Sequence, residues 1–162
     1  MRAFIALEVP VEVKEELLRV QESLRTIPAR CNFTNDFHIT IGFWINGNVE
    51  ILKKKLERIK HKKISAQINN IGTFGKPSKV VWAGITGEFH DLAMSMQKSE
   101  HFHPHITLLR VKKLFDEEKF SEMLKKIVMK KISFEIDTVS LFKSTPNNGF
   151  HTHERIASIT LA

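Results

Sequence analysis

The sequence contains the stretch His103-Pro104-His105-Ile106-Thr107-Leu108-Leu109-Arg110, whose His-x-Thr-apolar core has already occurred once, in Phe37-His38-Ile39-Thr40-Ile41. In a β-strand, residues two apart point to the same face. In each copy, the histidine and the threonine therefore share one face, and the aliphatic residues share the other. The pattern predicts two strands that are each anchored in a core and that each present an imidazole and a hydroxyl to a cavity.

This combination of side chains fits phosphate chemistry that needs no metal ion. One imidazole, with an ordinary pKa near 6.5, can accept a proton from an attacking oxygen while the other donates one to the oxygen that leaves. The hydroxyls of Thr40 and Thr107 can donate hydrogen bonds to non-bridging phosphate oxygens. A lone histidine in a strand is usually structural, but two copies of the pattern favour a catalytic pair, His38 and His105.

At these residues the sequence resembles the RNA 2′,3′-cyclic phosphodiesterases, also called 2′-5′ RNA ligases, of the 2H phosphoesterase superfamily. The resemblance spans most of the chain and includes residues 1–7, 38–43, 80–84 and 102–110. It implies a bilobal fold with a central cleft, metal-independent opening of a terminal 2′,3′-cyclic phosphate on RNA, and reversible 2′-5′ joining. It also implies that His105 is the general base, that His38 is the general acid and that Arg110 reaches the phosphate.

Two points about these roles stay open at the level of the sequence. The assignment with the two histidines exchanged uses the same residues. Arg110 lies an odd number of residues after His105, so a flat strand would turn it away from the cavity. We therefore expect the strand to end or twist near Leu109.

The composition is that of an ordinary soluble globular protein, with 162 residues, 42% of them hydrophobic and 27% charged. We find no membrane-spanning run and no signal peptide, and the single cysteine, Cys31, cannot form an internal disulfide. A cytoplasmic protein is expected. The net charge of +7 favours an anionic partner such as RNA, although clustered lysines also commonly solvate the outer faces of helices.

The hydrophobic pattern predicts eight strands and four helices in one chain. Strands are expected at 1–9, 31–34, 37–43, 63–74, 79–85, 103–110, 132–141 with a bulge near 137–138, and 154–161, and helices at 11–27, 49–59, 88–99 and 115–129. Each motif strand is followed by a helix and then by paired strands, which indicates a duplication. We therefore predict an α+β fold in which residues 1–162 form a single domain of two lobes. Two pseudo-symmetric, mainly antiparallel sheets would carry one motif each, with helices on the outer faces and a central cleft.

The chain departs from the family in three places. The piece between Gly84 and His103 is shorter than usual, no tyrosine is present, and Gly42 and Trp44 replace the residues expected after the first motif. The stretch Phe150-His151-Thr152-His153 stands where the family often has a tyrosine. Aromatic residues that could stack on a base are Phe43, Trp44 and Phe150, although packing is the favoured role for Phe43.

Two other functions compete with a metal-free enzyme. A zinc phosphoesterase could use His101, His103 and His105 together with His151 and His153, but Pro104 interrupts that strand and no carboxylate lies beside these residues. A non-catalytic RNA-binding module is supported by charge alone and leaves the paired motifs unexplained. We expect an enzyme without cofactor or metal, acting as a monomer on RNA with a 2′,3′-cyclic phosphate end, tRNA fragments included, and with no membrane partner.

Overall fold

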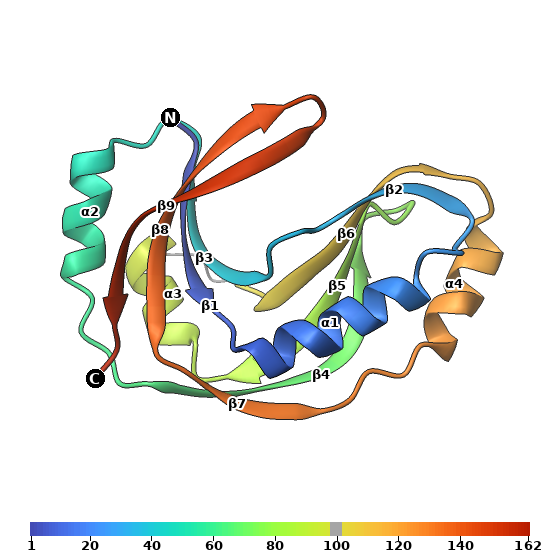
Figure 1. Cartoon of the computed structure of the whole chain (residues 1–162), viewed down its shortest axis with the longest axis horizontal. Coiled ribbons are helices and arrows are strands. Elements are labelled where there is room, and N and C mark those ends of the chain that lie inside the picture. Colours follow the sequence, from blue (N-terminus) through green and yellow to red (C-terminus); the bar gives the residue numbers. More distant parts are fainter. Residues whose placement is uncertain (98–101) are drawn as a thin grey trace.

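The two motif strands lie in different sheets. In the computed structural model, which describes residues 1–97 and 102–162, the described chain forms two antiparallel sheets and four helices (Figure 1). The first motif belongs to a four-stranded sheet and the second to a five-stranded sheet. The predicted α+β class is confirmed.

The four-stranded sheet has the strand order β3-β1-β8-β9. Its strands are β1 (Ala3–Glu8), β3 (His38–Trp44), β8 (Thr138–Asn147) and β9 (Phe150–Thr160). The five-stranded sheet has the order β2-β6-β5-β4-β7. Its strands are β2 (Ala29–Phe33), β4 (Ile64–Phe74), β5 (Val80–Gly87), β6 (His105–Leu114) and β7 (Ile132–Ile136). In both sheets the motif strand is the first of four adjacent strands, β3-β1-β8-β9 in one sheet and β6-β5-β4-β7 in the other. This shared order agrees with a duplication. The duplication itself stays a prediction.

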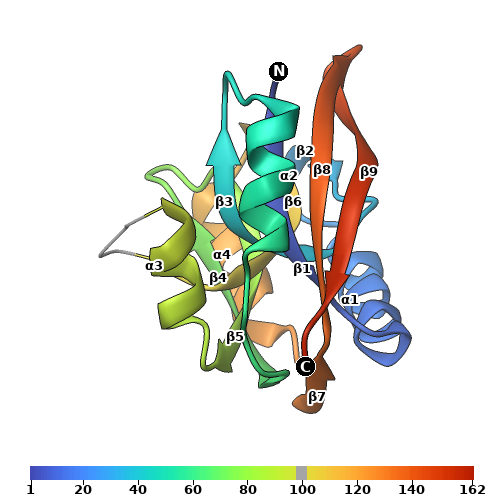
Figure 2. The same cartoon turned by 90° about the vertical axis from the view of Figure 1, so that its left-hand side faces the viewer.

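The helices are divided between the sheets. They are α1 (Val11–Ser23), α2 (Val49–Glu57), α3 (His90–Gln97) and α4 (Glu117–Lys126). Contacts join α1 to β6, α2 to β8 and β9, and α3 to β3, and Figure 2 shows α2 and α3 on the same side of the four-stranded sheet. Asn48 caps α2 by accepting a hydrogen bond from the amide of Ile51 at 3.1 Å.

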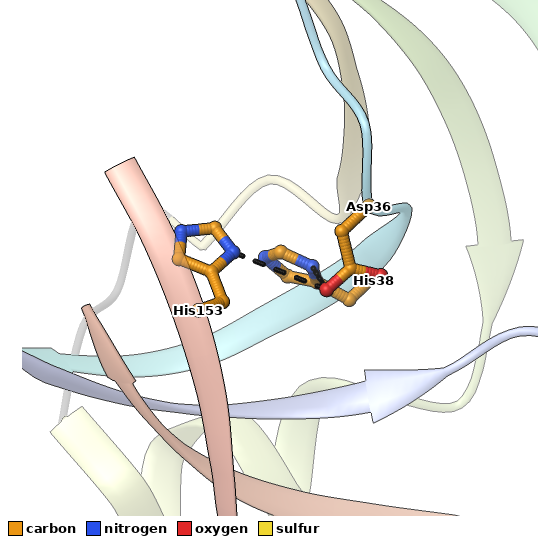
Figure 3. Close-up of side chains that lie close together, drawn as sticks. All are labelled: Asp36, His38 and His153. Carbon is orange, nitrogen blue, oxygen red and sulfur yellow. Dashed lines mark ion pairs between the residues drawn. The ribbon is translucent and has the colours of Figure 1, made fainter. Parts of the chain in front are cut away.

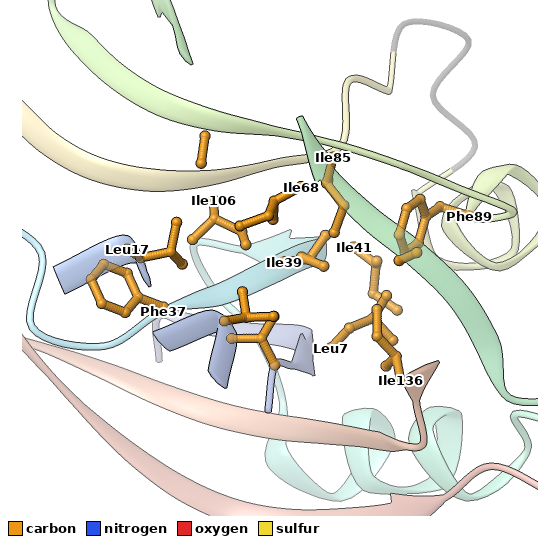
Figure 4. Packing of buried hydrophobic residues seen from close by; sticks show 14 of the residues in the cluster. Leu7, Leu17, Phe37, Ile39, Ile41, Ile68, Ile85, Phe89, Ile106 and Ile136 are labelled. Carbon is orange, nitrogen blue, oxygen red and sulfur yellow. The ribbon is translucent and has the colours of Figure 1, made fainter. Parts of the chain in front are cut away.

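One cluster of buried hydrophobic residues joins the two sheets. The aliphatic residues that alternate with histidine and threonine in the motifs are part of it, because Ile39, Ile41, Ile106 and Leu108 are all at most 1% exposed. Figure 4 shows Ile39 and Ile41 of β3 packed near Ile106 of β6. The motifs therefore anchor both sheets in a common core, as their alternation predicts.

Each motif strand contains a β-bulge at the same place in the motif. Pairing between β1 and β3 skips Ile41, and pairing between β5 and β6 skips Leu108. Consequently two consecutive residues turn toward the core in each strand, and the next residue returns to the face of the histidine. In β6 that residue is Arg110, and in β3 it is Phe43. The strand does not end near Leu109 but bulges there and continues to Leu114.

A buried glutamine holds the bulge of β6 against helix α1. The side-chain amide of Gln21 donates hydrogen bonds to the carbonyl oxygens of Thr34 and Leu108, both at 2.8 Å. The Leu108 carbonyl also accepts a hydrogen bond from the Thr34 amide at 2.9 Å. Gln21 is only 2% exposed, so water does not replace these bonds.

Two expectations from the sequence were wrong, namely the bulge near residue 137 and the start of the last strand. The expected bulge near Asp137 and Thr138 is a change of sheet, because β7 pairs with β4 in one sheet and β8 pairs with β1 in the other. The phase of the buried side chains shifts where the chain crosses between the sheets. The last strand begins at Phe150 rather than at Glu154, since Asn148 and Gly149 form a tight hairpin turn with positive φ.

Replacing Gln21 should destabilise the fold. In Gln21→Met the Thr34 carbonyl loses its amide donor in a buried place, so we expect the free energy of unfolding to fall by about 1–3 kcal/mol. Urea unfolding followed by circular dichroism measures the change. Glu15→Met, at an exposed position of the same helix, is the matched control and should change stability by less than about 0.5 kcal/mol. Equal effects of the two substitutions would contradict this role of Gln21.

Candidate active site

His38 lies in an aromatic wall on the four-stranded sheet. Its ring stacks on Phe4 of β1, with centroids 4.8 Å apart and planes inclined by 21°, and lies 5.9 Å from the ring of Phe142 on β8. His153 of β9 meets it edge-on at 5.5 Å. The side chain of His38 is 14% exposed. The imidazole is therefore held by packing and keeps only a small opening to solvent.

Two carboxylates lie near His38. The Asp36 Oδ2 atom is 4.0 Å from Nδ1 of His38 and 3.9 Å from Nδ1 of His153, so one carboxylate oxygen lies near both rings (Figure 3). Glu8 is the partner of His38 in the β1–β3 pairing. The Glu8 carboxylate accepts a hydrogen bond from the hydroxyl of Ser140 at 2.6 Å and is paired with Arg155.

His105 is held differently on the five-stranded sheet. Its Nδ1 atom lies 2.8 Å from the carbonyl oxygen of His103. A carbonyl can only accept, so Nδ1 carries the proton in the neutral ring and Nε2 keeps its lone pair. Phe74 meets the His105 ring edge-on at 5.0 Å, and Trp82 lies 6.4 Å away.

Burial keeps these imidazoles neutral. Burial lowers the pKa of His38 from 6.5 to about 4, while the carboxylates of Asp36 and Glu8 oppose that shift. Burial also lowers the pKa of His105, where the backbone hydrogen bond to His103 opposes it and the charges of His103 and Arg110 add to it. His153 has a lowered pKa for the same main reason. All three are expected to be uncharged at neutral pH when no anion is bound.

The charges also show which side chains lie near one another. A charge on His105 lowers the pKa of His38, and the charge of Arg110 lowers the pKa of both His105 and His153. His105 thus lies within electrostatic reach of His38, and Arg110 lies within reach of His105 and His153, although these residues come from different sheets. Arg110 is exposed and is free to contact an anion.

The two motif threonines stand on the histidine faces of their strands. Thr40 and Thr107 are partly exposed, while the residues on either side of each are buried. Within the described residues, neither hydroxyl has a protein hydrogen-bond partner. Both can therefore donate a hydrogen bond to a bound oxyanion.

The three aromatic candidates for stacking lie in different surroundings. Phe43, 36% exposed, lies on the histidine face of β3, with the guanidinium of Arg2 5.2 Å from its ring centre. Trp44 lies on the opposite face, where it packs against the core, and a side chain at Gly42 would collide with its ring. Phe150 is 53% exposed at the tip of the β8–β9 hairpin. The structure therefore leaves Phe43 and Phe150 accessible to a base, and not Trp44.

The tip of the β8–β9 hairpin contacts the other sheet. The side-chain amide of Asn32 on β2 donates a hydrogen bond to the carbonyl of Gly149 at 3.2 Å. Asn32 is also the neighbour of Arg110 in the β2–β6 pairing. The hairpin thus connects the sheet of His38 to the edge of the sheet that carries His105 and Arg110.

The zinc ligands considered from the sequence are not brought together in the described residues. His103 packs against Trp82 with centroids 4.7 Å apart, and His151 places Nδ1 3.3 Å from the hydroxyl of Ser144. His101 lies outside the described residues. Among the residues described, the only group of three or more candidate ligands is Asp36, His38 and His153.

Sequence reasoning missed several residues around the histidines. Phe4, Phe142, Phe74 and Trp82 form the walls of the two imidazole sites, and Asp36 lies beside His38. Asp36 stands two residues before His38, but nothing in the motif pattern marks it as part of the site. The alternation of Phe4, Ala6 and Glu8 is visible in the sequence, but which strand lies beside them is not.

A separate cavity of about 590 Å³ lies between α2 and α3. Its basic lining residues are Lys54, Lys55, Arg58, Lys60 and His61. None of the predicted catalytic or phosphate-binding residues lines it. Some of the positive charge noted in the sequence is therefore gathered away from His38 and His105.

A model of one protein family matches almost the whole chain. The family is described as LigT-like phosphoesterase, and the match covers residues 7–82 and 85–150. Both motif strands and Arg110 fall within the matched residues. The chain belongs to the LigT-like phosphoesterase family.

Two archaeal proteins are similar to this chain over most of their length. A protein of Methanocaldococcus jannaschii named RNA 2′,3′-cyclic phosphodiesterase is 27% identical over 161 residues, which cover 90% of this chain and 92% of that protein. A protein of the same name from Methanothermobacter thermautotrophicus is 26% identical over 179 residues, covering 94% and 95% of the two chains.

Solved structures share the fold of this LigT-like chain. The crystal structure of TT0787 of Thermus thermophilus matches with a TM-score of 0.82 and 19% identity, covering 99% of this chain and 98% of the other. Escherichia coli LigT complexed with 3′-AMP matches with a TM-score of 0.74 and 21% identity, covering 99% of this chain and 97% of the other.

In the described part of the chain, no helix has the length and apolar character needed to cross a membrane.

The buried His38 should make stability depend on pH. Because its pKa is about 4 in the folded chain and near 6.5 when unfolded, the unfolded chain binds more protons between these values. Stability should therefore fall as pH drops from 6.5 to 4, by on the order of 3 kcal/mol from this residue. His105 and His153 act in the same direction.

Urea unfolding at several pH values compares wild type with His38→Gln. The variant should lose part of this pH dependence, whatever its stability at pH 7. His61→Gln, at a partly exposed position outside the site, should keep the wild-type dependence. A His38→Gln curve parallel to that of wild type would show that His38 is not the group that titrates.

Proposed function

We propose that this chain hydrolyses 2′,3′-cyclic phosphate ends of RNA to 2′-phosphates without a metal ion. The observation that carries the proposal is the pair of partly buried, neutral imidazoles from two sheets, which lie within electrostatic reach of each other, with Arg110 within reach of His105. The names of the relatives agree with this reaction. Every proposed group comes from one chain, which supports action as a monomer.

The surroundings of the two histidines favour different roles. Nε2 of His105 has a free lone pair, and the positive charges of Arg110 and His103 disfavour a second proton on that ring. These features suit a general base. Asp36 and Glu8 favour the protonated form of His38, and a bound phosphate anion would favour it further, which suits a general acid. The free lone pair of His105 and the carboxylates beside His38 therefore support His105 as base and His38 as acid, and His38 has to gain its proton when the anionic substrate binds because its pKa is about 4 in the free chain.

The reaction then proceeds by in-line attack on the strained ring. Water transfers a proton to His105 as its oxygen bonds to phosphorus, and the bond between phosphorus and the 3′ oxygen breaks. His38 donates its proton to that 3′ oxygen, so the phosphate stays on the 2′ oxygen. Thr40, Thr107 and Arg110 hold the non-bridging oxygens and stabilise the negative charge that they gather in the transition state.

The same site supports 2′-5′ joining as a second activity. A 5′ hydroxyl of another RNA in place of water would give a 2′-5′ linkage, with His105 and His38 in the same roles. Reversal of that step regenerates the cyclic phosphate. This extension rests on the chemistry of the histidine pair and needs no further residue.

The substrate is proposed to be an RNA chain rather than a free nucleotide, tRNA fragments included. The net charge of +7 favours a polyanion. Phe43 on β3 and Phe150 at the start of β9 are 36% and 53% exposed and can stack on bases without selecting a sequence. A non-catalytic RNA-binding module would use the same charge but would not need two neutral imidazoles held in partly buried places.

Removing either histidine should nearly abolish hydrolysis. We expect His38→Ala and His105→Ala each to lower kcat by on the order of a hundredfold or more, because each loses one proton transfer. Release of the 2′-phosphate product from an oligonucleotide with a cyclic phosphate end, in excess EDTA, measures the rate. His61→Ala should react like wild type. Rapid turnover by either motif variant, or loss of wild-type activity in EDTA that zinc restores, would refute the metal-free mechanism.

A longer RNA should bind better than a cyclic mononucleotide. Each additional phosphate within reach of a lysine or arginine releases counterions, so KM for an oligonucleotide should be lower at low salt and should rise as salt is added. Steady-state kinetics for both substrates at two salt concentrations measure this. Equal KM values without salt dependence would mean that the site recognises little beyond the terminal phosphate.

A further inference from the structure

We propose that Asp36, His38 and His153 bind a first-row transition-metal ion such as Zn²⁺, and that this ion inhibits the enzyme by occupying His38. The inhibitory part rests on the function proposed above, whereas binding of the ion does not. The three residues come from the turn before β3, from β3 itself and from β9 (Figure 3).

The spacing of the candidate ligand atoms fits such an ion. One ligand atom from each residue lies within 4.8 Å of the other two. Oδ2 of Asp36 is 4.0 Å from Nδ1 of His38 and 3.9 Å from Nδ1 of His153. Zinc bonds of about 2.0–2.2 Å in a tetrahedron place ligand atoms roughly 3.4 Å apart. Small rotations of the Asp36 and His153 side chains, both on partly exposed positions, would bring the atoms to that distance.

A second observation points to a ligand at the same place. Nδ1 of His38 is buried and has no hydrogen-bond partner within the described part of the chain. Buried polar atoms are nearly always paired, and the 4.0 Å separation from Asp36 is too long for a hydrogen bond. The stacked ring of Phe4 fixes the direction of this nitrogen. A metal ion between His38 and Asp36 would give it the missing partner.

The donor set selects the class of ion. Two imidazole nitrogens and one carboxylate oxygen suit Zn²⁺, Co²⁺ or Ni²⁺, whereas Mg²⁺ and Ca²⁺ prefer oxygen ligands throughout. The charges nearby do not forbid a cation. Arg110 opposes it, Asp36 supplies a negative charge directly, and Glu8 is already paired with Arg155.

Binding at this nitrogen would stop His38 from acting as an acid. In the metal-free reaction, the protonated ring gives up the proton on Nε2 and keeps the one on Nδ1. With a metal ion on Nδ1 the ring cannot take a second proton there, and loss of the Nε2 proton would leave a metal-bound imidazolate. That loss is far less favourable, so the 3′ oxygen would leave without an effective proton donor.

The first experiment measures binding without activity. Protein treated with EDTA and freed of it by gel filtration is titrated with Zn²⁺ by calorimetry and with Co²⁺ by visible absorption. We expect one ion per chain for wild type and at least tenfold weaker binding for His153→Gln, which removes one ligand. His151→Gln, two residues away on the same strand, is the matched control and should bind like wild type. No binding, or binding unchanged in His153→Gln, would overturn the site.

The second experiment measures inhibition. Hydrolysis of a cyclic phosphate end by wild type should fall as Zn²⁺ saturates the site and should return when EDTA is added. The rate of His153→Gln, expressed relative to the rate of the same variant without metal, should resist the same concentration of Zn²⁺. Stimulation by Zn²⁺, or equal inhibition of both proteins, would overturn the inhibitory role. Zinc binding at this site in a protein with no hydrolytic activity would refute the proposed function and leave the metal site standing.

Discussion

The bulge at Leu108 and Leu109 turns two consecutive aliphatic side chains of β6 into the core, and Arg110 consequently points toward the side of His105. The arrangement of the histidine, the threonine and the arginine on one face depends on this reversal of phase. A strand without a bulge would have to expose Leu109 or bury Arg110, and either costs free energy. Gln21 fastens the bulge to a helix on the far side of the sheet, so the face that carries His105, Thr107 and Arg110 is supported from the core.

Burial lowers the pKa of both motif histidines, and different neighbours hold the two rings. Phe4 and Phe142 remove most of the water from around His38, and two carboxylates partly compensate for that loss. The carbonyl of His103 instead fixes the tautomer of His105. Two copies of one sequence pattern therefore have different surroundings, which are set by neighbours that are not part of the pattern. In the reaction proposed above, one ring accepts a proton while the other supplies one.

The sequence predicted the elements of the fold and the faces of the motif strands, because alternation with a period of two is a local property. It did not predict that the chain changes sheets at Asp137, since a phase shift looks the same for a bulge as for a crossing. The position of Arg110 was expected only by resemblance, although the adjacent pair Leu108-Leu109 is the local sign of the bulge. The proximity of His153 and Asp36 to His38 was missed for another reason. Their proximity to His38 depends on which strands are neighbours, and that is decided by pairing between distant parts of the chain.

The pairing of β1 between β3 and β8 has a consequence for how the protein is made. Ser140 and Glu8, which share a hydrogen bond in this sheet, are 132 residues apart in the sequence. All strands of the five-stranded sheet lie between residues 29 and 136, so that sheet can assemble while the remainder is still on the ribosome. The strand carrying His38 pairs early with β1, but its aromatic wall lacks Phe142 until β8 has been synthesised. Catalytic competence is therefore acquired late in translation, and the high sequence separation of these contacts predicts slow closure of this half of the molecule.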